Sequence, residues 1–233
     1  MPHSVPPPQP PAPPTARRVV DAVVFDLDGL LVNTEELYQH VGSEMLRRRG
    51  RSFDGELLDR MMGRPQRVAL QIMIDWHGLD ETIETLAAET SEIFTGLLDE
   101  RLEPMPGAVA LVERLARGGV PRGVATSSGP DFAHDVLGRV GLLDRFAFIL
   151  TSADVTHGKP YPEIYQTASR RLDVTPERML VLEDSEAGCR AAVAAGAVAV
   201  AVPGGHSRRH DFTGARFIAE SLEDRRILSL LGV

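Results

Sequence analysis

Short apolar runs alternate along this chain with longer segments of helical periodicity. The runs are rich in β-branched residues and predict strands at about 19–26, 120–126, 146–151, 179–182 and 197–202. The segments between the later runs predict helices at about 107–117, 131–140, 163–172 and 186–195. Strands that alternate with helices of this length are typical of an α/β fold, in which a doubly wound, Rossmann-like parallel sheet has helices on both faces.

A long stretch without a strand signal follows the first predicted strand. It reads as helices at about 34–49, 55–62, 65–77 and 81–101, separated by Gly50, Gly63 and Gly78. We therefore expect an all-helical cap at 33–103, inserted into an α/β core that comprises 17–32 and 104–233. Eight prolines fall within the first 15 residues, so 1–16 is expected to be a disordered or polyproline-like tail.

Composition restricts the classes of partner. The net charge of −8 argues against nucleic acid as a generic polyanionic partner. No apolar run is long enough to span a membrane. The single cysteine, Cys189, cannot form an internal disulfide, which favours a reducing compartment, and we expect a cytoplasmic protein that is a monomer or a weak dimer.

Polar clusters follow several of the predicted strands. Asp26 and Asp28 come after the first strand, and the others are Thr126 with Ser127, Lys159, and Glu183 with Asp184. In a parallel sheet the carboxyl ends of the strands lie at one edge, so these side chains should converge. Crowded carboxylates repel one another unless a cation neutralises them, and hard oxygen ligands suit Mg²⁺.

A magnesium ion and a lysine that face a carboxylate and a hydroxyl form a site for a phosphoryl group. A carboxylate is a weak base at neutral pH, but it can attack phosphorus directly and form an aspartyl-phosphate. The neighbouring aspartate could then give a proton to the leaving alkoxide and later take one from water.

Motifs in this order resemble those of the haloacid dehalogenase superfamily, in the subgroup with a helical cap after the first strand. The motifs are Phe25-Asp26-Leu27-Asp28-Gly29, Val124-Ala125-Thr126-Ser127, Gly158-Lys159-Pro160 and Leu182-Glu183-Asp184-Ser185. The resemblance implies Asp26 as nucleophile and Asp28 as general acid/base, with the backbone carbonyl of Asp28 on the metal.

The remaining motif residues also receive roles from the resemblance. Thr126 and Ser127 would hold the phosphoryl oxygens, and Lys159 would neutralise charge. Asp26, Glu183 and Asp184 would hold Mg²⁺ together with Asp28. In the cap, Arg64 and Arg67 could present cations to the substrate. Residues that open the cap, namely Asn33, Thr34 and Glu35, are expected to be structural, and Asn33 or Thr34 to cap the first helix.

Three functions remain open. The first is a Mg²⁺-dependent phosphatase for a small phosphomonoester, such as a sugar phosphate, phosphoglycolate or a nucleotide-like phosphate. The second is a phosphosugar mutase of the β-phosphoglucomutase kind, although those enzymes typically carry a histidine where this chain has Tyr38, and their cap arginine has no unambiguous match. The third is a non-catalytic binding protein on the same scaffold. Stretches at 126–128, 157–160 and 202–205 are similar to pseudouridine-monophosphate phosphatases.

Overall fold

A computed structural model describes residues 18–61, 64 and 66–232, so the tail predicted at 1–16 lies outside the described residues. The strands form one parallel sheet in the order β3-β2-β1-β4-β5-β6. Their bounds are Ala22–Phe25 (β1), Arg122–Ala125 (β2), Ile149–Leu150 (β3), Met179–Glu183 (β4), Val198–Ala201 (β5) and Phe217–Ile218 (β6). The predicted Rossmann-like α/β fold is confirmed.

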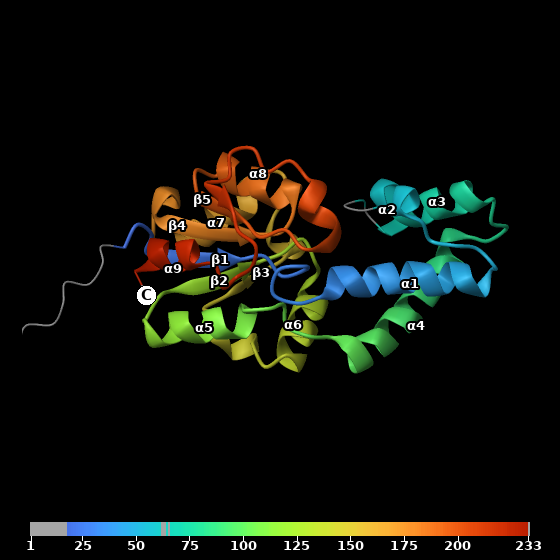
Figure 1. The fold of residues 1–233 in the computed structure, drawn as a ribbon, viewed down its shortest axis with the longest axis horizontal. Coiled ribbons are helices and arrows are strands. Elements are labelled where there is room, and N and C mark those ends of the chain that lie inside the picture. Colours follow the sequence, from blue (N-terminus) through green and yellow to red (C-terminus); the bar gives the residue numbers. More distant parts are fainter. Residues whose placement is uncertain (1–17, 62–63, 65, 233) are drawn as a thin grey trace, which may run out of the picture.

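The sheet is covered on both faces, as the uniformly apolar strands predict. Alternate residues of β1 point to opposite sides, so Val23 and Val24 belong to different hydrophobic clusters. One face packs against α5, α6 and α9, which span Ala108–Arg117, Pro130–Arg139 and Arg225–Leu231. The other face packs against α7 (Glu163–Leu172) and α8 (Glu186–Ala194) (Figure 1).

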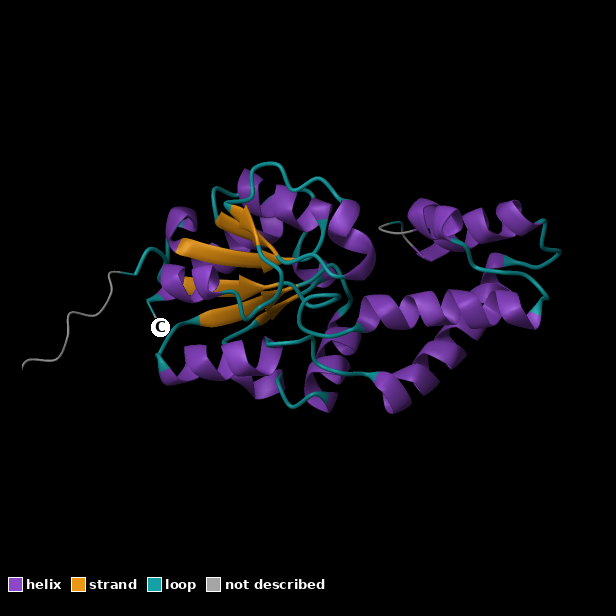
Figure 2. Ribbon diagram, in the orientation of Figure 1, coloured by secondary structure: helices purple, strands orange, loops and turns teal. Residues whose placement is uncertain are grey.

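In the described ranges, four helices lie between β1 and α5 and extend away from the sheet, beyond the carboxyl ends of its strands (Figure 2). They are α1 (Thr34–Arg48), α2 (Gly55–Met61), α3 (Gln66–His77) and α4 (Ile83–Arg101). The segment by which the chain enters this helical unit lies beside the segment by which it leaves. Asn33 joins the two crossings: its side-chain amide donates to the carbonyl of Arg101 and accepts from the backbone N–H of Glu103. Asn33 therefore occupies the N-cap position of α1, as expected, but its side chain makes no hydrogen bond to the helix.

The differences from the sequence expectations are concentrated at the sheet edges. The third strand, expected at 146–151, spans only Ile149–Leu150, because β3 pairs with β2 alone. The strand β6 and the helix α9 were not expected; β6 is a two-residue edge strand, too short to give a periodic signal. Within the described ranges, no helix is both long and apolar enough to cross a membrane.

Candidate active site

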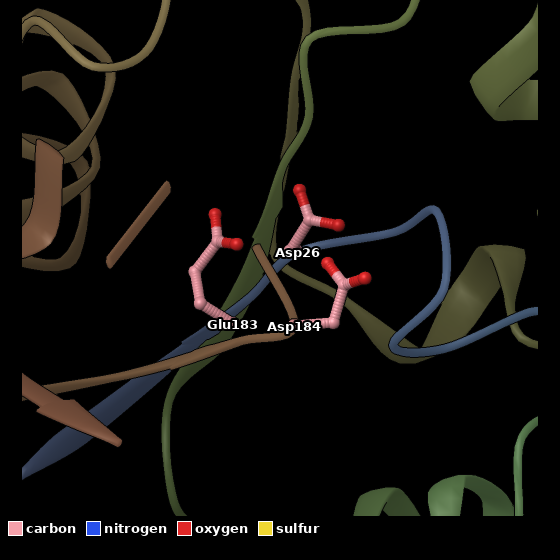
Figure 3. Close-up of side chains that lie close together, drawn as sticks. All are labelled: Asp26, Glu183 and Asp184. Atoms are coloured by element: carbon pink, nitrogen blue, oxygen red, sulfur yellow. The ribbon is translucent and has the colours of Figure 1, made fainter. Parts of the chain in front are cut away.

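Three acidic side chains converge at the carboxyl ends of two neighbouring strands. Asp26 follows β1, Glu183 is the last residue of β4, and Asp184 follows it. Each offers one carboxylate oxygen to a group in which all three atoms lie within 4.8 Å of one another (Figure 3). All three side chains are buried, and we call them the acidic centre.

Lys159 supplies a buried cation to this centre from the loop that precedes α7. Its Nζ donates to Asp26 Oδ1 at 2.5 Å, to Glu183 Oε1 at 2.6 Å and to the carbonyl of Ala125 at 2.9 Å. Burial favours the neutral amine, but the adjacent charges of Asp26 and Glu183 prevail and raise the pKa of Lys159 above its ordinary value. Lys159 is therefore an ammonium that bridges two carboxylates.

Glu183 is held by a second set of donors. The Tyr165 hydroxyl, from α7, donates to Glu183 Oε1 at 2.5 Å, and the Ser185 hydroxyl donates to Oε2 at 2.9 Å. Burial, reinforced by the charge of Glu183, raises the pKa of Tyr165 well above its ordinary value, so its phenol keeps the proton that it donates. Gly188 leaves room for the carboxylate, since a Cβ there would lie 1.8 Å from Glu183 Oε1.

One ammonium does not balance three carboxylates. Burial raises the pKa of Asp26 well above its ordinary value, Lys159 opposes this shift, and repulsion from Glu183 and Asp28 adds to it. Burial also raises the pKa of Asp184, and the charges of Asp26 and Glu183 raise it further. A divalent cation would relieve both costs, and carboxylate oxygens are the ligands that Mg²⁺ prefers.

Asp28 lies beside the acidic centre and accepts only from hydroxyl groups in the contacts that the structure describes for it. Thr34, the first residue of α1, donates to Asp28 Oδ1 at 2.7 Å. Ser128 and Thr126, which follow β2, donate to Asp28 Oδ2 at 2.7 and 3.1 Å. These bonds join the first turn of the helical unit to the sheet edge through one carboxylate.

The two residues of the cluster that follows β2, Thr126 and Ser127, lie in different surroundings. Thr126 is buried and engaged with Asp28, whereas Ser127 is exposed. Both residues, together with Lys159, line a cavity of about 120 Å³. Sequence reasoning assigned no role to Ser128 or Tyr165. Ser128 lies in a strand-end loop, where the convergence argument applies, whereas Tyr165 lies within a helix and gives no such signal.

The cap arginines lie outside this group of contacts. Arg67 is exposed and forms an ion pair with Glu84, with Nη2 and Oε1 2.9 Å apart. Arg64 is exposed, and Gly63 and Pro65 on either side of it lie outside the described residues. For the part of the chain that the structure describes, no contact joins either arginine to the acidic centre.

Comparison with known proteins identifies relatives across most of the chain. It is 34% identical over 187 residues to a validoxylamine A 7'-phosphate phosphatase of Streptomyces hygroscopicus subsp. limoneus, a match that covers 78% of this chain and 85% of the relative. A phosphorylated carbohydrates phosphatase of Thermotoga maritima is 32% identical over 76% of this chain and 82% of its own. A Drosophila melanogaster protein described as a probable pseudouridine-5'-phosphatase is 32% identical over 89% of this chain and 92% of its own.

Solved structures agree with this relationship. CbbY from Rhodobacter sphaeroides, in complex with phosphate, superposes with a TM-score of 0.73 at 28% identity, over 87% of this chain and 95% of that one. A β-phosphoglucomutase of Clostridium difficile gives a TM-score of 0.68 at 24% identity, over 87% and 92%, which supports the fold alone. Residues 23–202, with the acidic centre and Lys159 among them, match the family described as haloacid dehalogenase-like hydrolase, and the chain belongs to that family.

Proposed function

We propose that this chain, a haloacid dehalogenase-like phosphatase, uses Mg²⁺ and an aspartyl-phosphate on Asp26 to hydrolyse small phosphomonoesters. The observation that carries the proposal is the buried ammonium of Lys159, bonded to Asp26 Oδ1 beside two further carboxylates. A surface ion pair would contribute little to stability and would be screened by solvent. A buried charged group in a cleft at the strand ends is the arrangement expected where a phosphoryl group is bound.

The donor set fits a magnesium ion. Three carboxylate oxygens lie within 4.8 Å of one another, and burial makes their combined charge costly without a cation. Asp26 and Asp184 would hold the ion together with the backbone carbonyl of Asp28. Glu183 would add a third carboxylate, and its orientation is fixed by Lys159 and Tyr165, which both donate to it. When bound, Mg²⁺ supplies positive charge to the phosphoryl oxygens.

The residues of the chain would act in two steps. Asp26 attacks phosphorus, the bond from phosphorus to the ester oxygen breaks, and Asp28 gives its proton to the leaving alkoxide. Asp28 then takes a proton from water, which attacks the phosphoryl group and frees Asp26. Throughout both steps, Lys159, Thr126 and Ser127 hold the negatively charged phosphoryl oxygens.

The helical unit α1–α4 would act as a cap that excludes water from the site. Its Arg64 and Arg67 would contact the far end of a substrate, once Arg67 exchanges its exposed ion pair with Glu84 for the substrate. We place hydrolysis ahead of phosphosugar mutase activity, because Tyr38 stacks on Phe94 and occupies the position of the histidine typical of the mutases. The one cysteine, buried Cys189, fits a reducing, cytoplasmic location.

Trapping of the phosphoenzyme tests the mechanism. With an aryl phosphate, Asp28→Asn should still be phosphorylated, because this leaving group needs no acid, but should lose its phosphoryl group about 10²–10⁴-fold more slowly. Asp26→Asn should never carry label. Label on a serine or histidine would overturn the role of Asp26, and full turnover in chelator would overturn that of Mg²⁺. Formation of glucose 6-phosphate from β-glucose 1-phosphate would favour the mutase.

A further inference from the structure

A cavity of about 210 Å³ lies between the helical unit and the sheet edge and has no role in the two steps above. Gly29, in the loop after β1, forms part of its wall. The first two turns of α1 contribute Glu35 and Gln39, and Met105 and Gly204 close the opposite side. The volume suits a small metabolite rather than a polymer.

The cavity adjoins the acidic centre. Gly29 has φ +77°, and a Cβ built on it would lie 2.5 Å from Asp184 Oδ2 and 3.2 Å from Glu35 Oε2. The two carboxylates therefore approach the same glycine, one from the acidic centre and one from the cavity. The leaving group of an ester whose phosphorus faces Asp26 would extend toward Glu35.

The cavity wall is acidic and able to form hydrogen bonds. Among its described lining residues, Glu35 and Glu36 carry carboxylates and neither lysine nor arginine is present, while the His40 imidazole is hydrogen-bonded through Nδ1 to the carbonyl of Glu36. Tyr38 lies three residues after Glu35 and so on the same side of α1. Its ring stacks on Phe94 with centroids 4.3 Å apart and remains 47% exposed. Tyr38 is not among the described lining residues, so the Glu35 carboxylate is the group that can accept hydrogen bonds from the hydroxyls of a polyol in the cavity.

We propose that Glu35, expected from the sequence to be structural, determines specificity by accepting hydrogen bonds from the hydroxyls of an uncharged polyol leaving group. The same carboxylate, with Glu36 beside it, repels a leaving group that carries a carboxylate next to the phosphoester. The inference rests on the proposed phosphatase function. It selects polyol and sugar phosphates and rejects phosphoglycolate.

Two esters of similar length isolate the effect. Glycerol 3-phosphate presents hydroxyls where phosphoglycolate presents a carboxylate. With Mg²⁺ added, kcat/KM of the wild type should favour glycerol 3-phosphate by at least about tenfold. Glu35→Gln, which keeps the shape and removes the charge, should lower this ratio about 10- to 100-fold, the value of one hydrogen bond to a charged group.

The matched control is Glu44→Gln. Glu44 lies on the same helix, where it pairs with Arg47 and Arg48 instead of lining the cavity. The control variant should therefore have the same ratio of kcat/KM values for the two esters as the wild type. A wild-type preference for phosphoglycolate would overturn the inference, and so would an unchanged ratio of kcat/KM values in Glu35→Gln. In either case the enzyme would still hydrolyse a phosphomonoester, so the proposed phosphatase function would stand. If the wild type hydrolysed neither ester nor p-nitrophenyl phosphate, the proposed function would fail, and the inference with it.

Discussion

Replacing Lys159 with methionine tests how the acidic centre is stabilised. Methionine keeps an unbranched side chain of similar length but removes the ammonium that Asp26 and Glu183 share. The side chains concerned are 5%, 8% and 0% exposed, so solvent screens this interaction very little. Without Lys159, the folded protein has to accept either a buried uncompensated charge or an additional proton.

Two independent estimates give the size of the effect. Removing one partner of a buried ion pair costs about 3–5 kcal/mol of folding free energy. Protonating a carboxyl group of ordinary pKa near 4 at pH 7 costs about 1.36 kcal/mol for each of three pH units, or roughly 4 kcal/mol. We infer that a carboxyl group kept ionised by Lys159 in the wild type takes up a proton when Lys159→Met folds.

The additional proton gives the loss a characteristic pH dependence. Because this carboxyl group is protonated in the folded variant and ionised in its unfolded state, the free energy of unfolding relative to wild type should fall by about 1.4 kcal/mol per unit of rising pH. The deficit should therefore be about 4 kcal/mol at pH 7 and about 1.4 kcal/mol at pH 5.

Urea denaturation of both proteins in chelator at pH 5, 6 and 7 measures this difference. A deficit below about 1 kcal/mol at pH 7, or one that does not change with pH, would refute the reasoning.

Further substitutions, with controls, test three other sites. Gly188→Ala should destabilise the protein by about 3–5 kcal/mol, because its Cβ displaces Glu183 from Lys159. The control Gly96→Ala, at a helical site with open space around it, should stabilise the protein by up to about 1 kcal/mol. Thermal melts of both variants measure these changes. Thr34→Val should lose about 1.5–3 kcal/mol in urea melts through the missing bond to Asp28, and Thr34→Ser should lose much less. Burial, together with the charges of Asp28 and Glu36, raises the pKa of Glu35 from 4.5 to about 7. Ionising Glu35 therefore destabilises the folded protein, and this destabilisation is absent below pH 4.5 and complete above pH 7. Glu35→Gln in chelator should therefore be more stable than wild type by roughly 1–3 kcal/mol at pH 8 and equal to it at pH 4.

The sequence carries the arrangement of the sheet edge more clearly than the contacts within it. Asp26 and Asp184 each follow an apolar strand, and parallel pairing of β1 with β4 is enough to bring them together. Lys159 was expected at the same edge. The partners of Asp28 could not be foreseen, because Thr34 and Ser128 are residue types that serve equally well as helix caps and turn residues. Tyr165 reaches Glu183 only through the packing of α7 against the sheet, which no local pattern encodes.

The burial of Lys159 has a practical consequence, because it is the only lysine among the 233 residues and the other 24 basic side chains are arginines. Reagents that acylate or reductively methylate amines find one ε-amino group in the chain, and it is 5% exposed and held in its unreactive protonated form. Its modification rate therefore reports the opening of the active site, without any engineered label. A single isotopically labelled methylamine at Lys159 would give one side-chain resonance, distinct from that of the α-amino group, that reports on the surroundings of this side chain.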